Sequence, residues 1–184
     1  WLYNYAMAGE MNKVVGHTLV DLDGERANVR TKETNLGNLV ADIMKAAAKT
    51  EIAVTNGGGI RASLKKGDIT VGGIITVLPF DNSLVVIELT GKTLLEALEL
   101  SVSKYPEQLG GYLQVSGVAF KVDPAKPAGS RVSDVMVNGA ALSLTRLYTV
   151  ATNDFTAAGG DGYAMFKSAK VLYQSGIMLR DVAI

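Results

Sequence analysis

The feature that most constrains the fold is an amphipathic helix pattern followed directly by a short apolar strand and a run of glycines. Between residues 33 and 50 the apolar side chains recur at helical spacing, and Thr34 or Asn35 can cap the N-terminus. Residues 51–55 then read EIAVT, which is typical of a buried strand, and residues 56–61 read NGGGIR. Because glycines at a strand end let the backbone approach a ligand closely, the pattern predicts a helix packed on a sheet with a ligand loop at the sheet's edge.

The rest of the pattern adds strands and one more helix. Residues 83–90 are typical of a β-branched strand, and residues 93–96 (Thr-Leu-Leu-Glu) form a capping box that opens a helix through about Tyr105. The pair Asn138-Gly139 is a strong hairpin signal. The chain of 184 residues is therefore expected to form a single α+β domain with a mixed β-sheet and packed helices. Further strand patterns occupy residues 112–122, 131–137, 147–152 and 171–174.

Charge and composition exclude several classes of function. Lys and Arg together number 18, as do Asp and Glu, so no basic face is expected and binding to a nucleic acid polymer is disfavoured. The absence of cysteine rules out a disulfide framework and a thiolate metal site. With His17 as the one histidine, a metal cluster would need carboxylates and amides, so a self-contained metallohydrolase is disfavoured and His17 is given no role. No apolar run approaches the roughly 18 to 20 residues of a membrane span.

The glycine loop at residues 56–61 is the first candidate site. Its backbone amides and the guanidinium of Arg61 suit an anion, although the glycine spacing fits neither the dinucleotide fingerprint nor the P-loop. Arg26 and Arg30 precede the first helix and present planar donors that suit phosphate. From the residues alone, a flexible turn and a pair of exposed surface arginines remain the alternatives.

A second strand followed by a glycine loop, at residues 153–163, carries groups that suit a nucleoside. Phe155 can supply a stacking face, and Asp161 can accept hydrogen bonds from sugar hydroxyls. The alternative is a tight turn in which Asp161 bonds to its own backbone. Phe80 lies in a proline-fixed turn at residues 79–82, where it either belongs to the core or faces a ligand.

These segments occur in an order that points to one family. From about Val14 onward, the chain resembles the C-terminal domain of the 5'-nucleotidase family, which includes 2',3'-cyclic-nucleotide phosphodiesterases and nucleotide-sugar hydrolases. Any one of the motifs is weak, whereas the whole set in this order with compatible spacing is specific. The motifs are residues 33–39 (ETNLGNL), 56–61 (NGGGIR), 67–70 (GDIT), 79–82 (PFDN), 89–91 (LTG) and 153–163 (NDFTAAGGDGY).

The resemblance implies a two-domain enzyme that hydrolyses nucleotide phosphate esters. In this family an N-terminal metallophosphoesterase domain holds two divalent metal ions and the catalytic residues, and the C-terminal domain binds the nucleotide or nucleoside. Residues 14–184 would form the C-terminal domain, and residues 1–13 the segment that connects it to the metallophosphoesterase domain. The chain is then expected to carry no catalytic residue, to bind no metal or other cofactor and to be inactive alone. The family also implies a secreted, periplasmic or cell-surface protein.

The resemblance assigns roles to particular side chains. Two rings would sandwich the base, a carboxylate would bind the ribose hydroxyls, and arginines would contact the phosphate, the first of them being present in some family members. The glycine loop would contact the substrate through its first residue and its backbone. The implied substrate-binding residues are Arg26, Arg30, Asn56, Gly58, Arg61, Phe80, Phe155 and Asp161.

Two interpretations outside catalysis remain open from the sequence. One is a stand-alone module that binds nucleotides or phosphorylated sugars without hydrolysing them. The other is a structural module whose glycine loops are turns. Within the enzyme interpretation, the sequence leaves open whether the substrate is a monophosphate, a cyclic nucleotide or a nucleotide sugar, because part of that choice belongs to the other domain.

Overall fold

The computed structural model describes the backbone of residues 2–184 and the side chains of residues 7–184. Trp1, the first residue of the predicted connecting segment, lies outside the described residues. The α-helices are α1 (Leu2–Met11), α2 (Arg26–Val29), α3 (Asn35–Ala48), α4 (Val71–Val77), α5 (Gly91–Ser101), α6 (Asp154–Ala157) and α7 (Leu179–Ala183). Short 3₁₀ turns form η1 (Gly57–Gly59), η2 (Gly160–Gly162) and η3 (Ala164–Phe166). The strands are β1 (Val14–Thr18), β2 (Ile52–Asn56), β3 (Gly67–Thr70), β4 (Ser83–Thr90), β5 (Leu113–Ser116), β6 (Val118–Val122), β7 (Val132–Val137), β8 (Ala140–Ala141), β9 (Leu147–Asn153) and β10 (Lys170–Met178).

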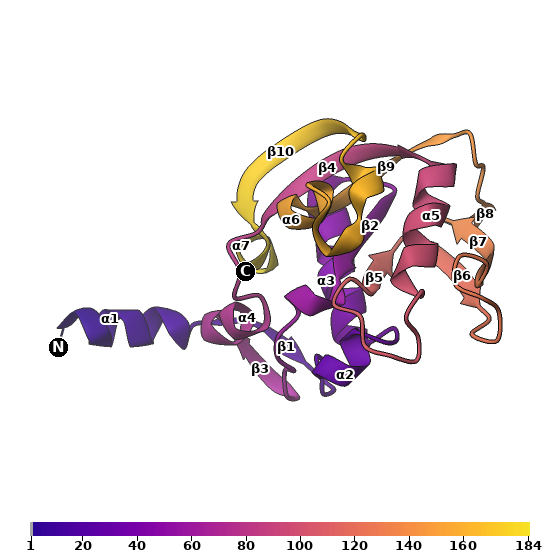
Figure 1. The fold of residues 1–184 in the computed structure, drawn as a ribbon. Helices are drawn as coiled ribbons and strands as arrows, with labels where there is room; N and C mark the ends of the chain where they lie inside the picture. Colours follow the sequence, from indigo (N-terminus) through magenta and orange to yellow (C-terminus); the bar gives the residue numbers. More distant parts are fainter. Residues whose placement is uncertain (1) are drawn as a thin grey trace.

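A five-stranded sheet forms the centre of the fold, with the strand order β10-β4-β9-β2-β5 (Figure 1). β2 runs parallel to β9, and the other neighbouring pairs in this sheet are antiparallel. Smaller sheets join β1 to β3, and β6 to β7 and β8. The predicted fold class, a single α+β domain with a mixed sheet, is confirmed.

Apolar side chains of the central sheet point alternately into two cores, one on each face. Along β2, Ile52 and Val54 belong to the core that α5 completes, whereas Ala53 between them belongs to the core that α3 completes. Tyr163 and Phe166 join the α5 core, and α4 and α7 join the α3 core. Because helices cover both faces of the sheet, a ligand can reach its strands at their ends.

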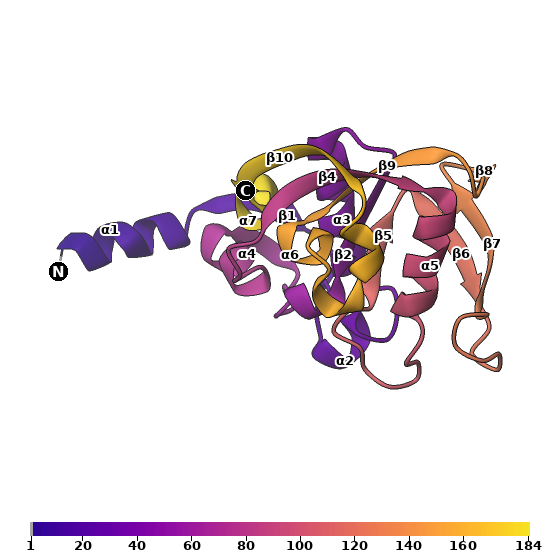
Figure 2. The ribbon, with the colours of Figure 1, turned by 45° about the horizontal axis from the view of Figure 1, so that its top comes forward.

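The ends of the molecule carry the smaller elements. α1 extends away from the body of the fold and contacts α4, while the three-stranded sheet β6-β7-β8 lies at the opposite end, beyond α5 (Figures 1 and 2). None of the helices in the described part of the chain has the length and apolar character that crossing a membrane requires.

The first predicted helix and strand are confirmed. The helix α3 begins where predicted, because the hydroxyl of Thr34 accepts a hydrogen bond from the backbone amide of Gly37 (3.0 Å). The strand patterns at residues 51–55 and 83–90 correspond to β2 and β4. The hairpin at Asn138-Gly139 is also confirmed, since both residues have a positive φ (47° and 84°), as a tight β-hairpin requires.

Two predicted elements have different bounds in the structure. The helix predicted to open at Thr93 is α5, which begins at Gly91, because Thr90 is the capping residue and accepts from the backbone amide of Thr93 (3.2 Å). The single strand predicted over residues 112–122 is split into β5 and β6. Gly117 separates them with a φ of +77°, and the chain there leaves the central sheet for the three-stranded one.

Gly117→Ala should destabilise the fold more than the matched variant Gly139→Ala, although both glycines have a positive φ. An added Cβ at Gly117 would lie 2.2 Å from the carbonyl oxygen of Glu51, whereas at Gly139 it would meet open space. We expect the unfolding free energy to fall by about 1 kcal/mol at Gly139, from backbone strain alone, and by about 3 kcal/mol or more at Gly117. Urea unfolding measures both losses, and equal losses would contradict the importance of the clash.

Candidate functional site

Four strand ends meet at one edge of the central sheet, and this edge carries the candidate site. Because β2 and β9 are parallel neighbours, Asn56 at the end of β2 lies near Asn153 at the end of β9. β4 is antiparallel to β9, with Leu84 opposite Asn153, so the turn before β4 reaches the same edge. β5 is antiparallel to β2, with Leu113 opposite Asn56, which brings in the loop before β5.

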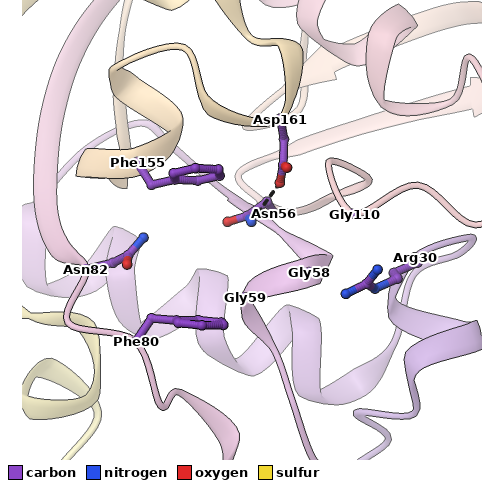
Figure 3. Close-up of a pocket in the computed structure, with 9 residues that line it drawn as sticks. All are labelled: Arg30, Asn56, Gly58, Gly59, Phe80, Asn82, Gly110, Phe155 and Asp161. Carbon is purple, nitrogen blue, oxygen red and sulfur yellow. Dashed lines mark hydrogen bonds between the residues drawn. The ribbon is translucent and has the colours of Figure 1, made fainter.

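A pocket of about 270 Å³ opens at this edge (Figure 3). All of the substrate-binding residues predicted from the sequence except Arg26 and Arg61 line it. The pocket is lined by Arg30, Asn56, Gly58, Gly59, Phe80, Asn82, Gly110, Phe155 and Asp161. In Figure 3 the two phenylalanine rings lie toward one end of the pocket and Arg30 toward the other, with Asn56 and Asp161 between them.

The two phenylalanine rings face each other across the pocket (Figure 3). Phe80 is 48% exposed and Phe155 is 45% exposed, so neither ring belongs to the core. Phe155 packs on Gly160, where an added Cβ would lie 2.6 Å from its ring carbons Cε1 and Cζ. Phe80 contacts the guanidinium of Arg61, whose Cζ lies 5.8 Å from the ring centroid. Two exposed rings that face each other in this way leave a gap that can hold a flat apolar group.

A relay of side-chain amides holds the carboxylate of Asp161. Asn153, which is 1% exposed, donates from Nδ2 to Oδ1 of Asn56 (3.0 Å), and Asn56 donates from Nδ2 to Oδ2 of Asp161 (2.9 Å). Asp161 adopts a left-handed backbone conformation, with a φ of +54°. The contact with Asn56 differs from the local turn that sequence alone left open, in which Asp161 would bond to its own backbone. A carboxylate has further acceptor capacity, so Asp161 can also accept from hydroxyl groups of a ligand.

Arg30 lines the end of the pocket away from the rings, within electrostatic range of two further arginines. Burial and the positive charges of Arg26 and Arg61 lower the pKa of the Arg30 guanidinium. The carboxylate of Asp161 acts in the opposite direction. Arg26 and Arg61 are exposed and lie outside the pocket lining, and Nη1 of Arg61 is 3.5 Å from the carbonyl oxygen of Gly58. Guanidinium groups close enough to repel one another create a positive region that a small anion would neutralise.

Sequence reasoning singled out neither Asn82 nor Gly110, although both line the pocket. Asn82 lies in the same turn as Phe80, and its Nδ2 is 3.4 Å from Oδ1 of Asn153. Gly110 precedes β5, and its carbonyl oxygen accepts from the backbone amide of Gly58 (2.8 Å). The turn motif could have indicated Asn82, whereas Gly110 belongs to no motif and reaches the pocket through the pairing of β5 with β2.

The described residues do not fit the metal pair that the family resemblance implies. Within residues 2–184, no group of three or more His, Cys, Asp or Glu side chains is arranged to hold a metal ion. His17 hydrogen-bonds through Nδ1 to Oδ1 of Asp68 (3.0 Å), and both lie outside the pocket. The site therefore offers stacking, hydroxyl recognition and anion binding through its own side chains.

Comparison with known proteins gives matches over nearly the whole chain. A trifunctional nucleotide phosphoesterase from Bacillus subtilis, YfkN, is 48% identical over an alignment of 167 positions that covers 86% of this chain and 11% of that protein. A 5'-nucleotidase from Diplobatis ommata is 33% identical, over 96% of this chain and 34% of that protein. The crystal structure of the 5'-nucleotidase precursor from Thermus thermophilus superposes with a TM-score of 0.91 at 44% identity, over 98% of this chain and 37% of that one.

The chain thus spans between about a tenth and somewhat over a third of the length of these relatives. The family model described as the 5'-nucleotidase, C-terminal domain, matches residues 14–168. With the fold, the order of the motifs and this match in agreement, the chain belongs to the 5'-nucleotidase family and corresponds to its C-terminal domain.

Proposed function

We propose that this chain is the nucleotide-recognition domain of a phosphoesterase that hydrolyses nucleotide phosphate esters. The order of chemical groups along one pocket carries the proposal: a pair of rings, then a carboxylate, then the guanidinium of Arg30, with Arg26 and Arg61 in electrostatic range of it. A nucleotide presents a flat base, a sugar with hydroxyls and a phosphate in the same order. The names of the relatives, which are nucleotidases and nucleotide phosphoesterases, support the same substrate class.

In this proposal each part of the nucleotide has its own residues. The base stacks between Phe80 and Phe155, and the ribose hydroxyls donate to Asp161, which Asn56 holds in place. Arg30 and Arg61 bind the phosphate, with Arg26 adding positive charge beside them. Gly58, Gly59 and Gly110 keep the floor of the pocket free of side chains.

The reaction itself is proposed for a longer protein. Residues 14–184 would be its C-terminal domain, and residues 1–13 would connect them to an N-terminal metallophosphoesterase domain that holds two divalent metal ions. The described residues of this chain do not provide the ligands of such a metal pair. These residues bind the nucleotide and fix its position. The activation barrier is then lower, because the phosphate is already oriented for the reaction. We also propose that the protein acts outside the cytoplasm, as a secreted, periplasmic or cell-surface enzyme.

Alanine in place of Phe80 or Phe155 should weaken nucleotide binding irrespective of the base. Each ring is expected to contribute roughly 1 to 3 kcal/mol, because stacking uses a face that every base has. Isothermal titration of the chain with AMP, GMP, CMP and UMP measures the loss. Tyr173→Ala is the matched control, since Tyr173 is an exposed aromatic residue (57%) on β10, outside the pocket. Unchanged affinities in both phenylalanine variants would remove the rings from the binding site.

Arg30→Ala and Arg61→Ala should weaken binding of a nucleoside monophosphate by a larger factor than binding of its nucleoside. A charge-assisted hydrogen bond to phosphate is worth about 1.5 to 3 kcal/mol, and the nucleoside makes no such bond because it has no phosphate. The control is Arg146→Ala, because Arg146 stacks on Tyr148 and pairs with Glu51 outside the pocket. If both arginine variants weakened nucleoside and nucleotide by the same factor, the phosphate role would be wrong.

The chain alone should bind AMP without hydrolysing it, even with added Mn²⁺ or Mg²⁺, because its one histidine and lack of cysteine leave few strong metal ligands. Release of inorganic phosphate by the purified chain, abolished by a chelator, would contradict this expectation. The proposal for the longer protein has its own test: the chain extended by the sequence that precedes it in its gene should release phosphate from AMP. Binding without hydrolysis in that longer protein would favour the stand-alone binding module.

A further inference from the structure

Two buried side-chain amides stand behind the pocket and do not line it. Gln114 on β5 and Asn153 at the end of β9 are each 1% exposed. A buried amide satisfies its donors and acceptor within the protein, so its partners are fixed by the fold. The partners of Gln114 belong to the segment that carries Arg30, whereas Asn153 contacts Asn56, which holds Asp161 in the middle of the pocket.

Gln114 holds the segment that carries Arg30. Its Nε2 donates to the carbonyl oxygens of Val29 (3.1 Å) and Lys32 (2.8 Å), and its Oε1 accepts from the backbone amide of Thr34 (3.2 Å). These contacts bracket Arg30 along the chain. The preceding helix α2 is a single turn of four residues, and such a short helix does not fix a side chain by its own hydrogen bonds.

The position of the Gln114 amide is itself restricted. Gly37 on α3 faces it so closely that a Cβ there would lie 2.1 Å from Oε1 of Gln114. The amide therefore occupies a slot between α3 and the segment that precedes it. Because the Gln114 side chain is held on both sides, it fixes the backbone around Arg30 relative to β5.

Asn153 holds the carboxylate of Asp161 through Asn56. Its Nδ2 donates to Oδ1 of Asn56, and this fixes which way the Asn56 amide faces, because Asn56 must then present its own Nδ2 to Asp161. The Oδ1 of Asn153 accepts from the backbone amide of Thr156 (2.9 Å), which caps α6. A reversed Asn56 amide would place an oxygen against the carboxylate of Asp161 and repel it.

We propose that Gln114 and Asn153 are positioning residues that act on separate parts of the ligand, Gln114 on the phosphate through Arg30 and Asn153 on the ribose through Asp161. The inference rests on the proposed function of the pocket. Among the side-chain hydrogen bonds of the described residues, none joins the partners of Gln114 to those of Asn153. The two amides therefore act through separate sets of hydrogen bonds, and Arg30 and Asp161 remain linked only by the electrostatic attraction between them.

The test measures the affinity of the chain for three ligands: the tightest-binding nucleoside monophosphate, its nucleoside and its 2',3'-dideoxynucleoside. Gln114→Met removes all three hydrogen bonds at similar size, and Gln114→Glu keeps the acceptor for Thr34 while losing both donors. Asn153→Asp keeps the acceptor that caps α6 and removes the donor to Asn56. Asn153→Ser is a smaller uncharged substitute that is too short to reach Asn56.

The variants at each position should change a different ratio of affinities. Gln114→Met should lower the affinity for the monophosphate by about tenfold, because the guanidinium of Arg30 is displaced, and should change the affinity for the nucleoside by no more than about twofold. Asn153→Asp should lower the affinity for the monophosphate and for the nucleoside alike by about tenfold. It should change the affinity for the dideoxynucleoside by no more than about twofold. In an Arg30→Ala background, the variants of Gln114 should have no further effect on the monophosphate.

Ser116→Ala is the matched control for a purely structural role. Ser116 is also buried on β5, but its hydroxyl donates to Asp42 on α3, away from the arginine segment. Its loss should lower the unfolding free energy and preserve all the ratios of affinities. The inference would be overturned if the variants at Gln114 or Asn153 lowered the affinity for all three ligands by the same factor. It would also be overturned if both substitutes at one position failed to fold. Either result would assign that amide a structural role.

The same titrations separate this inference from the proposed function. A wild-type chain that binds no nucleoside monophosphate contradicts the proposed function, and the inference with it. A wild-type chain that binds the monophosphate and depends on Arg30, with unchanged ratios in the variants of Gln114 and Asn153, contradicts the inference alone.

Discussion

Ile52 pairs with Val150 and Ala53 with Ala151, so β2 and β9 run in parallel and end at the same edge of the central sheet. Segments almost a hundred residues apart in the chain, each a strand followed by a glycine-containing turn, are thereby brought side by side. The antiparallel neighbours β4 and β5 begin where β9 and β2 end, and so add their preceding loops to the same edge. The site depends on this pairing, because no single segment carries more than part of it.

The glycines of the loop after β2 allow close packing and also line the candidate pocket. The backbone amide of Gly57 donates to the carbonyl of Tyr112 (2.7 Å), and an added Cβ at Gly57 would lie 1.9 Å from the carbonyl oxygen of Val29. This close approach brings the arginine segment and the loop before β5 against the end of β2. Gly58 and Gly59 then line the pocket. The same loop thus makes a tight structural turn and lines the candidate pocket, so the two interpretations of the glycine run do not exclude each other.

The sequence predicted the elements whose periodicity is strong and local. The strands β2 and β4 are rich in β-branched residues, and α3 has a clear cap at Thr34. The start of α5 was misplaced because Thr90 and Thr93 are both suitable caps, and tertiary packing selects Thr90. The break at Gly117 was missed because it follows from the contact with the carbonyl of Glu51, which lies on a distant part of the chain.

The family resemblance identified residues that the structure gathers at one edge of the central sheet. It could not supply the contacts among these residues. The stacking of Arg61 on Phe80, the relay through Asn56 and the approach of Gly110 all join segments that are far apart in sequence. Such contacts depend on strand order and register, which no local pattern encodes. For the same reason, Gln114 was invisible to sequence reasoning: a glutamine in a strand gives no sign that it reaches the backbone around Arg30.

The surroundings of the pocket also show how a chain of zero net charge can carry a local positive region. Equal numbers of acidic and basic residues remove any long-range attraction for polyanions, whereas Arg26, Arg30 and Arg61 lie within electrostatic range of one another beside the pocket. Val29, next to Arg30, is anchored in the core of α3, whereas Tyr163, which follows Asp161, is anchored in the core of α5. The segments that carry Arg30 and Asp161 are thus anchored in cores on opposite faces of the sheet. Their side chains meet beside Gly110, where an added Cβ would lie 3.8 Å from Nη1 of Arg30 and 3.9 Å from both carboxylate oxygens of Asp161. The arrangement of the candidate pocket therefore depends on both cores being intact.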